Sequence, residues 1–596
     1  MNALALRYNA PLYDFRSKIV HITLLSPQLD TAIFCILSII MMICLMFAKR
    51  PWSSHTRLSV SVLALLALIP LLFLIGASSL ITPLLFVVAS ISMILTLMEI
   101  KGSYAFWVSL KKIFLYVIVI LTIIELEAVA LWLSAPLSPT KIFLPDVEII
   151  KLETELFYIS QGFVLPILVL TFFFWAFFVI KALFQVKGLK FKTITLNFNF
   201  KLKLSGQSSW RFNACFLKVS LLSISICSIL LVLFLTYYPY SPILNPLGAY
   251  KGVDIPQYVE WLSKAAISPM MDVFPQNRLL SLMFLYLFWK ATGLSALMAV
   301  QSFMIILGIL LVISVSYFLY SLRVDYTTKV FSVLFTVLSF HVTTAIFGGF
   351  LSNLTCLVGV YIFSAFFVKA MERRSWRWIG LATATMGLLL FIHSYTWAML
   401  MGVLVVYAVF HVVKWLRVRG SMEEFRLVGA ILIVNILLDF ARNTIINRMG
   451  VAVEATRVAG SNLSLRNISF FWDTLGKSVS QGMEGTLMNP LMYVLAMFGA
   501  FVVFTCWDKP FYRYLGCWLV ASSVPLLFAS GKIQIRILYN IPFQILAAIG
   551  LSVILKSLNG DSKVDKVLRW VLVLWVILVN LNYAFRCMYV ISQFSF

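Results

Sequence analysis

The stretch with the clearest capacity for chemistry is "NPLGAYKGVDIPQYVEWL", residues 245–262, because its first acid stands far from any earlier one. No Asp or Glu occurs between Glu155 and Asp254. A carboxylate beside a hydroxyl group can accept its proton as a general base. An Asp before "IP" also suits the N-cap of a helix that has Pro256 at an early position. The residues alone leave both interpretations open.

The composition places this carboxylate in a membrane protein. The chain has 596 residues, of which 62% are hydrophobic and only 12% charged, too few to cover a soluble protein of this length. The net charge of +24 would suggest nucleic acid in a soluble protein. Here the cations lie in short segments between apolar runs, so we expect them to set topology and to contact anionic lipids, with no nucleic-acid partner.

The apolar runs predict an all-α polytopic membrane protein, because a spanning helix needs about 20 such residues. We expect about 16 transmembrane helices. They begin near Thr31, Leu58, Leu80, Ile113, Leu156, Leu217, Leu294, Val330, Phe350, Trp378, Thr396, Leu427, Leu487, Phe511, Ile537 and Val567. The basic turns "AKRPW" and "KGSYAFWVSLKK" are expected in the cytoplasm, which places the N-terminus outside.

One segment decides the rest of the topology. "RLLSLMFLYLFWKATG" (Arg278–Gly293) is apolar enough to be taken for a short span. If it crossed, the later basic turns "SLRVDYTTK", "MERRSWRW" and "KWLRVRG" would all lie outside, and otherwise all three are cytoplasmic. We therefore predict an interfacial helix that lies along the outer surface.

A change of composition near residue 212 divides the chain into two membrane modules. We predict an N-terminal five-helix module at 1–184, a basic cytoplasmic linker at 185–212, and a second module at 213–596. The linker contains "ITLNFNFKLKL", whose period-2 alternation favours a short extended strand. In the second module most acids fall in two expected outer loops, 238–293 and 441–485.

The second module resembles the C-type (GT-C) superfamily of polytopic membrane glycosyltransferases. An apolar span is followed by a "G-x-D-x-x-x-Y" loop holding Asp254 and Tyr258, then by "NRLLSLMFLYLFWKATGLS". The similarity continues in "FGGFLSNLTCLVGVYIFSAFFVKAMERRSWRW", "LLLFIHSYTWAMLM" and "GKIQIRILYNIPFQILAAIGLSVIL". The resemblance implies transfer of a sugar from a polyprenyl-phosphate carrier. It also implies that Asp254 activates or orients the acceptor, with Tyr258 beside the substrate.

Such a reaction needs cations for its leaving group, which is already a phosphate. Arginine suits phosphate because its planar fork donates two hydrogen bonds at once. We expect Arg536 to bind the lipid phosphate, with Lys532 one turn away and Arg278 as a second candidate. His393, near the outer end of its span, is a further candidate for the phosphate groove. A snorkelling cation and a hydrogen-bonded structural histidine are the alternative interpretations of Arg536 and His393.

Two further features limit the reaction. "SVSQ" at 478–481 resembles the "SVSE" of archaeal oligosaccharyltransferases, but Gln481 stands in place of the functional Glu. We therefore expect transfer of a monosaccharide. No cofactor is required, although Asp254 with Asp272 or Glu454 could form an oxygen site for a divalent metal.

The sequence thus predicts a cell-membrane glycosyltransferase that moves a sugar, with inversion, to a glycan, lipid or protein acceptor at the outer face. A flippase or transporter for lipid-linked sugars is one alternative, although its polar residues would lie at mid-membrane. A non-catalytic subunit of a cell-envelope assembly is another. A polysaccharide polymerase or ligase of different fold would also place Arg and acids outside.

Overall fold

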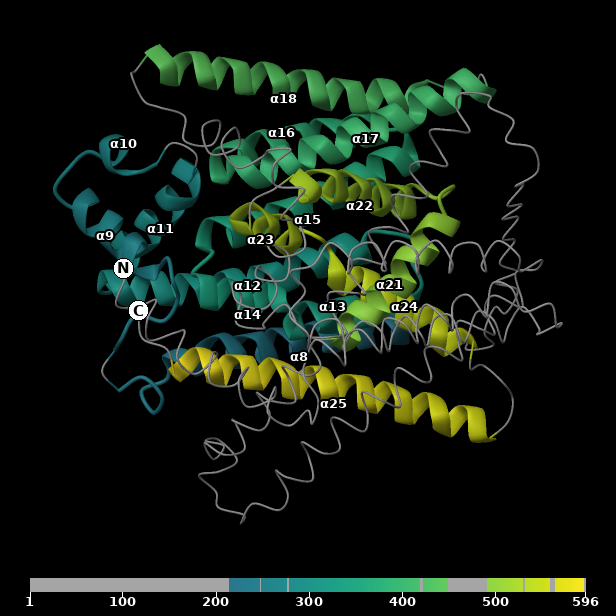
Figure 1. Ribbon diagram of the computed structural model, residues 1–596, viewed down its shortest axis with the longest axis horizontal. Coiled ribbons are helices and arrows are strands. Elements are labelled where there is room, and N and C mark those ends of the chain that lie inside the picture. The colour runs from purple at the N-terminus through teal and green to yellow at the C-terminus, as the bar shows by residue number, and fades with distance from the viewer. Residues whose placement is uncertain are drawn as a thin grey trace, which may run out of the picture. The chain divides into compact units, whose positions relative to one another are not determined.

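The computed structural model describes a set of long helices that belong to the second module (Figure 1). The described residues are 214–246, 248–275, 278–418, 422–448, 490–528, 531–557 and 563–593. The N-terminal module, the basic linker with its expected strand, and residues 449–489 of the second outer loop lie outside them. Residues 441–448, expected in that loop, are instead the last two turns of a helix.

The elements that the structure describes are all helices. In chain order they are α8 (Ala214–Tyr237), η1 (Tyr238–Tyr240), α9 (Ile255–Ala265), α10 (Met270–Val273), α11 (Leu279–Thr292), α12 (Ala296–Tyr320), α13 (Tyr326–Leu338), α14 (Phe340–Gly348), α15 (Leu351–Arg373), α16 (Trp376–Ile392), α17 (Ser394–Val418), α18 (Glu423–Arg448), α21 (Pro490–Thr505), α22 (Pro510–Phe528), α23 (Gly531–Tyr539), α24 (Phe543–Ser557) and α25 (Lys563–Gln593).

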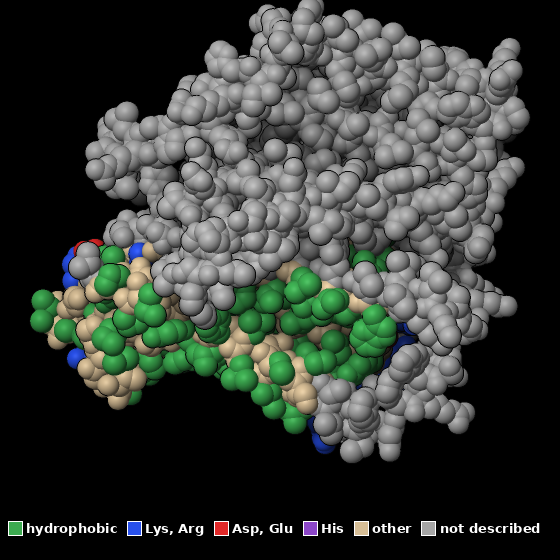
Figure 2. All heavy atoms as spheres, turned by 90° about the horizontal axis from the view of Figure 1, so that it is seen from below, with side chains coloured by type: hydrophobic (Ala, Val, Ile, Leu, Met, Phe, Trp, Pro, Cys, Tyr) green, Lys and Arg blue, Asp and Glu red, His purple; other side chains and the backbone are tan. Residues whose placement is uncertain are grey.

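Several helical segments are long and apolar enough to cross a bilayer. Within the described residues these are Leu221–Tyr240, Ala296–Tyr320, Tyr326–Gly348, Leu351–Arg373 and Ser394–Val413, with α23 and α24 together as a bent sixth. The protein is therefore a multi-pass integral membrane protein. Figure 2 shows hydrophobic side chains across the middle of one face of the described part, with Lys and Arg at its two ends. The total of about 16 spans stays a prediction.

Helices α8 and α12 pack antiparallel and define two ends of the bundle. Ser225, midway along α8, lies 3.4 Å from Ser316 near the end of α12, measured between the hydroxyl oxygens. Farther along, Gly308 of α12 lies so close to α8 that a Cβ there would meet a side-chain carbon at 3.2 Å. We call the end where α8 finishes and α12 begins the Asp254 end. The opposite end, where α22 begins, is the Arg513 end.

The chain between α8 and α12 stays at the Asp254 end, where α9, α10 and α11 group together (Figure 1). The hydroxyl of Ser281, in the first turn of α11, donates to the hydroxyl of Ser352 at the start of α15, at 2.7 Å. At the other end of α11, the Trp289 indole donates to the Leu294 carbonyl just before α12, at 2.8 Å. Helix α11 therefore does not carry the chain to the Arg513 end, which is the arrangement that the basic turns predicted.

Two of the long segments are broken. The segment Tyr326–Gly348 is interrupted at Ser339, which has an extended backbone and whose hydroxyl donates to the Thr336 carbonyl at 3.2 Å. A serine that bonds its own backbone in this way competes with helix continuation. The second break separates α23 from α24 by a bend of 47° just before Pro542, which lacks an amide hydrogen. Both breaks bear on the site described next.

Candidate functional site

The loop that carries Asp254 is fastened to the turn between α14 and α15. The amide of Val253 donates to the Phe347 carbonyl at 2.9 Å, and the amide of Asp254 donates to the Gly348 carbonyl at 3.2 Å. Gly252 has a φ of +116°, and a Cβ there would lie 2.6 Å from the Ile346 carbonyl oxygen. A glycine is therefore required for this close approach. The backbone of Asp254 is held by α14 rather than by its own loop.

The Asp254 side chain does not cap α9. Asp254 is the residue before the helix, yet its carboxylate makes no capping hydrogen bond. Within the described residues it also has no ion pair within 4.0 Å. Burial raises the pKa of Asp254, and the nearby charges of Arg278 and Arg536 lower it, so that the pKa remains above its ordinary value. The capping explanation is therefore not what the structure shows.

The two arginines that act on Asp254 come from different elements. Arg278 is the residue before α11, and its guanidinium lies over the Trp261 ring at 5.5 Å from the ring centre. Its Nε is buried and has no hydrogen-bond partner among the described residues. Arg536 in the last turn of α23 lies over the Tyr395 ring at 5.6 Å. Aromatic stacking of this kind holds a guanidinium in place while leaving its N–H groups for a ligand.

His393 lies between α16 and α17 and belongs to the same electrostatic cluster. Burial lowers its pKa well below the ordinary value, and the charges of Arg278 and Arg536 lower it further. Its Nδ1 lies 2.9 Å from the Thr396 hydroxyl and 3.3 Å from the Thr396 amide nitrogen, so the first turn of α17 holds the ring. A neutral imidazole brings no positive charge to a phosphate. Its visible role is to cap α17.

Tyr258, the third residue carried over from the resemblance, is only 1% exposed. Its hydroxyl lies 3.3 Å from the Ser352 hydroxyl, which also accepts from Ser281. Its ring packs edge-on against Trp261 at 5.4 Å between ring centres. The contacts show a residue that joins α9 to α15 and supports the aromatic ring beneath Arg278.

Several buried polar residues around the cluster were not predicted from the sequence. Thr396 donates to Asn353 at 2.8 Å, and the Asn540 amide donates to the Arg536 carbonyl at 2.7 Å. Lys251 is 3% exposed and donates to the Ser592 carbonyl of α25 at 2.7 Å. Asn353 begins a glycosylation sequon within an apolar run. A polar residue inside an expected membrane span was the sequence signal that could have identified it. Together they fasten the elements that hold the cluster.

The structure describes only part of two predicted features, the phosphate-binding Lys532 and a possible metal site. Lys532 lies in the first turn of α23, one turn before Arg536, and its side chain is outside what the structure describes. The described residues include no group of three or more His, Cys, Asp or Glu placed to hold a metal ion. Glu454, one of the acids considered for such a site, and the "SVSQ" motif lie outside the described residues.

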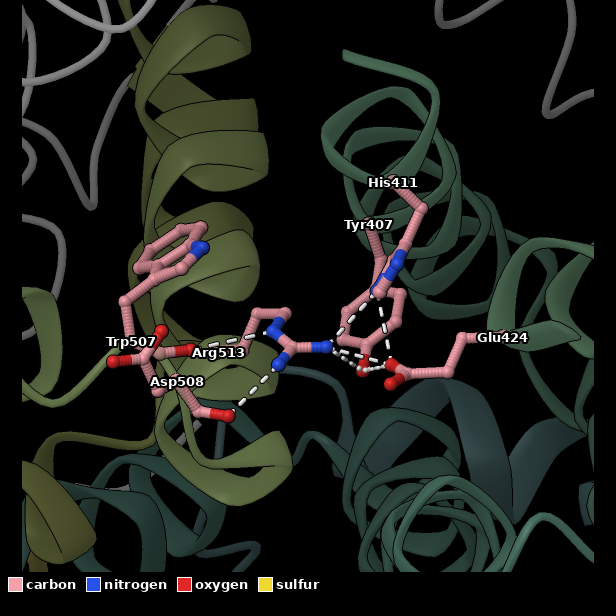
Figure 3. A network of polar contacts seen from close by, with 6 residues as sticks. All are labelled: Tyr407, His411, Glu424, Trp507, Asp508 and Arg513. Atoms are coloured by element: carbon pink, nitrogen blue, oxygen red, sulfur yellow. Dashed lines mark hydrogen bonds and ion pairs between the residues drawn. The ribbon is translucent and has the colours of Figure 1, made fainter. Parts of the chain in front are cut away.

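A second charged cluster lies at the Arg513 end (Figure 3). The Arg513 guanidinium contacts the Glu424 carboxylate at 2.6 Å, His411 Nε2 at 3.0 Å and the Tyr407 hydroxyl at 3.3 Å. It also donates to the carbonyls of Trp507 and Asp508. Burial raises the pKa of Glu424, but His411 and Arg513 outweigh this and lower it to about 2. Here every guanidinium nitrogen has a protein partner.

Comparison with known proteins gives structural similarities, one of which is described here. No family model and no curated protein matches the chain. A crystal structure of the Archaeoglobus fulgidus oligosaccharyltransferase, tethered to an acceptor peptide with an NVT sequon, matches with a TM-score of 0.42 and 12% identity. The match covers 63% of this chain and 55% of that one, so the chain spans a little over half of that protein's length.

Proposed function

We propose that the protein is a membrane glycosyltransferase that moves a monosaccharide from a polyprenyl-phosphate donor to an acceptor hydroxyl. One observation carries the proposal: a carboxylate without a capping bond lies in one electrostatic cluster with two stacked arginines, at one end of a membrane-spanning bundle. The cluster offers a base and two phosphate ligands, which are the groups that this reaction needs.

The reaction assigns a separate role to each charged residue. The acceptor oxygen attacks the anomeric carbon while Asp254 takes the hydroxyl proton, and the bond from that carbon to the phosphate oxygen breaks. Arg536 and Arg278 hold the departing phosphate, whose negative charge grows as the bond breaks. A single displacement of this kind inverts the anomeric carbon. His393, Tyr258 and the buried amides position these groups without touching the reacting atoms.

The location of the cluster supports a lipid-linked donor. Arg536 and Arg278 lie at the end of the bundle where several membrane-length segments begin or finish, which is the depth of a lipid headgroup. A donor anchored by a polyprenyl chain would present its phosphate at that depth. We place this end at the outer face of the cell membrane, from the distribution of the basic turns.

The test is an assay with the purified full chain in lipid nanodiscs. Polyprenyl phosphates bearing radiolabelled glucose, mannose or galactose are supplied with native membranes as the acceptor source. Transfer appears as label in a product that is no longer extracted as sugar lipid, together with stoichiometric polyprenyl phosphate. In proteoliposomes, movement of intact sugar lipid between leaflets without loss of sugar would instead identify a flippase. If no donor is either consumed or moved while polyprenyl phosphate fails to bind, the proposal is wrong.

A further inference from the structure

At their breaks, the two broken segments are joined by hydrogen bonds to one buried residue, His341. It is the second residue of α14, directly after the break at Ser339, and it is fully buried. Its Nε2 lies 3.1 Å from the carbonyl oxygen of Ile541, which is in the break between α23 and α24. Its own carbonyl accepts from the Tyr539 hydroxyl at 2.9 Å. Two breaks that are about 200 residues apart are thus linked by hydrogen bonds to His341, beside the ring contacts of Phe340 with Tyr539 and Phe543.

The chemistry of the contact with Ile541 fixes its direction. A carbonyl oxygen only accepts, so Nε2 of His341 must carry a proton and donate it to Ile541. Nδ1 of the neutral ring is then an acceptor 3.0 Å from the Ser339 hydroxyl, whose single proton is within reach of both Nδ1 and the Thr336 carbonyl. The partner of each ring nitrogen lies in one of the breaks: the Ser339 hydroxyl for Nδ1 and the Ile541 carbonyl for Nε2. In a continuous helix, such a carbonyl would accept from an amide of the same helix.

Each break leads to one half of the candidate site. On one side, α14 ends in the Phe347 and Gly348 carbonyls that accept the amides of Val253 and Asp254. On the other, α23 ends at Tyr539, and it carries Arg536 one turn earlier. The short helix α14 therefore holds the carboxylate, and the short helix α23 carries the guanidinium. We call these two helices the arms, and His341 joins them at the breaks, next to Ser339 and Ile541.

We propose that His341 is a positioning residue, which fixes the spacing between the Asp254 carboxylate and the Arg536 guanidinium by bridging the two helix breaks. The role in transfer rests on the proposed function, whereas the bridge itself is a structural claim that can be tested alone. A reaction between two held groups is sensitive to their placement, because a misplacement of about 1 Å can lower a rate by about 10²-fold.

The experiment compares His341→Leu, which removes both ring hydrogen bonds, with His341→Gln, whose amide can donate to Ile541 and accept from Ser339. Phe340→Leu is the apolar comparison: the Phe340 ring stacks on the imidazole at 4.3 Å and also contacts Tyr539 and Phe543, so this variant trims an apolar contact across the breaks and leaves the hydrogen bonds. Tyr539→Phe removes only the hydroxyl that donates to the His341 carbonyl. It provides a second, milder variant if His341→Leu does not fold.

The first readout is a distance that does not depend on activity. Nitroxide labels are placed at Gln257 on α9, whose preceding loop is held by α14, and at Ile535 on α23, in a background without reactive cysteines. Pulsed electron paramagnetic resonance then reports the distance between α9 and α23. A second pair at Trp415 and Trp570, which are exposed on α17 and α25, reports whether the bundle is intact. We expect His341→Leu to broaden the first distribution and leave the second unchanged, and His341→Gln and Phe340→Leu to retain both.

The second readout is transfer by the same variants. We expect His341→Leu to lower kcat roughly 10²-fold while KM changes only a few-fold, and His341→Gln to retain most of the wild-type kcat. If His341→Leu keeps the wild-type distance distribution, or if His341→Gln broadens it as much, the bridge is wrong whatever the activity. If the distances behave as expected but the wild-type chain transfers nothing, the proposed function fails and the bridge stands.

Discussion

The two charged clusters contain similar residues in opposite states. At the Arg513 end, Glu424 and Arg513 lie 2.6 Å apart, and the guanidinium is surrounded by protein acceptors. At the Asp254 end, the described residues give the carboxylate no ion pair, and Arg278 keeps a buried Nε without a partner. The pKa of Glu424 is lowered by its contacts with His411 and Arg513, whereas the pKa of Asp254, which has no such contact within the described residues, is raised by burial.

The difference shows how to separate a structural cluster from a site. A buried ion pair is tolerated only when further hydrogen bonds satisfy its remaining groups, as Tyr407 and the 507–508 carbonyls do for Arg513. A cluster that leaves donors and a carboxylate unsatisfied lowers the stability of the protein unless a ligand completes it. The Arg513 cluster therefore holds α17, α18 and α22 together, whereas under the proposed function the Asp254 end receives a ligand.

The largest effect is expected from breaking the satisfied cluster. Arg513→Met leaves the partly buried Glu424 carboxylate with only His411 and Tyr407 as partners among the described residues, and loss of one member of a buried ion pair destabilises a protein by up to about 3–5 kcal/mol. We expect a clear loss of thermal stability in detergent, while the fraction that remains folded keeps its activity per molecule. The measurement is thermal unfolding, followed by transfer assayed on the folded fraction.

The matched control is Arg374→Met, because Arg374 forms an exposed ion pair with Glu423 at 3.1 Å. Exposed pairs contribute about 0–1 kcal/mol, so this variant should melt close to the wild type. Equal destabilisation by both variants would mean that the Arg513 cluster is not special. A selective loss of kcat in folded Arg513→Met would contradict the division of roles between the two ends.

The next largest effect is expected at the other carboxylate. Asp254→Asn keeps the side-chain shape but removes the base, so transfer should fall by about 10²-fold or more. Since the carboxylate makes no capping bond, thermal stability should not fall. Glu260→Gln is the control, because Glu260 is exposed and pairs with Lys264 on the same helix. An active Asp254→Asn enzyme would remove the central residue from the mechanism.

A smaller effect is expected when the arginines become lysines. Arg536→Lys and Arg278→Lys keep the charge but lose the planar fork and the stacking on Tyr395 or Trp261. We expect each to weaken binding of polyprenyl phosphate by about tenfold, the loss of roughly one charge-assisted hydrogen bond. Lys290→Gln, at the far end of α11, should bind as the wild type does. Unchanged binding in both arginine variants would place the phosphate elsewhere.

The sequence predicted the elements better than their interruptions. Each apolar run after residue 213 coincides with a helix or a broken pair, because hydrophobic length alone determines a span. The breaks at Ser339 and Ile541 were not predicted, since the apolar pattern continues through both and the bond that joins them spans 200 residues. The non-crossing Arg278–Gly293 segment was predictable, because the position of the basic turns depends on it.

The candidate site was predicted in part for the same reason. Topology alone places Asp254, Arg278, Arg536 and His393 at one end of the bundle. It cannot show which of them are already paired. The Arg513 cluster was missed because its members come from three helices and each resembles an ordinary charge at a helix end. Pairing is a property of side-chain packing between distant elements, so it becomes visible only in the structure.

The smallest effect is expected in the pH dependence, where the two ends should respond in opposite directions. The folded-state pKa of Glu424 is about 2, below the ordinary value. Its contribution to stability is therefore complete above the unfolded pKa of about 4.3 and is lost as the pH falls toward 2. The folded-state pKa of Asp254 is raised. Protonation therefore favours the folded state at this residue, and stability from that source is lost as the pH rises through the folded pKa.

The same raised pKa controls activity, because only the ionised carboxylate accepts a proton. We expect kcat/KM to fall on the acid side at a pKa above the ordinary value for Asp, while the Arg513 end is still fully paired and the protein remains folded. Arg278→Gln removes a positive charge that lowers the Asp254 pKa, so its acid limb should move to higher pH. Glu424→Gln should leave that limb unchanged and alter only the acid stability. An acid limb that moves with Glu424→Gln and not with Arg278→Gln would show that the titrating group lies at the other end.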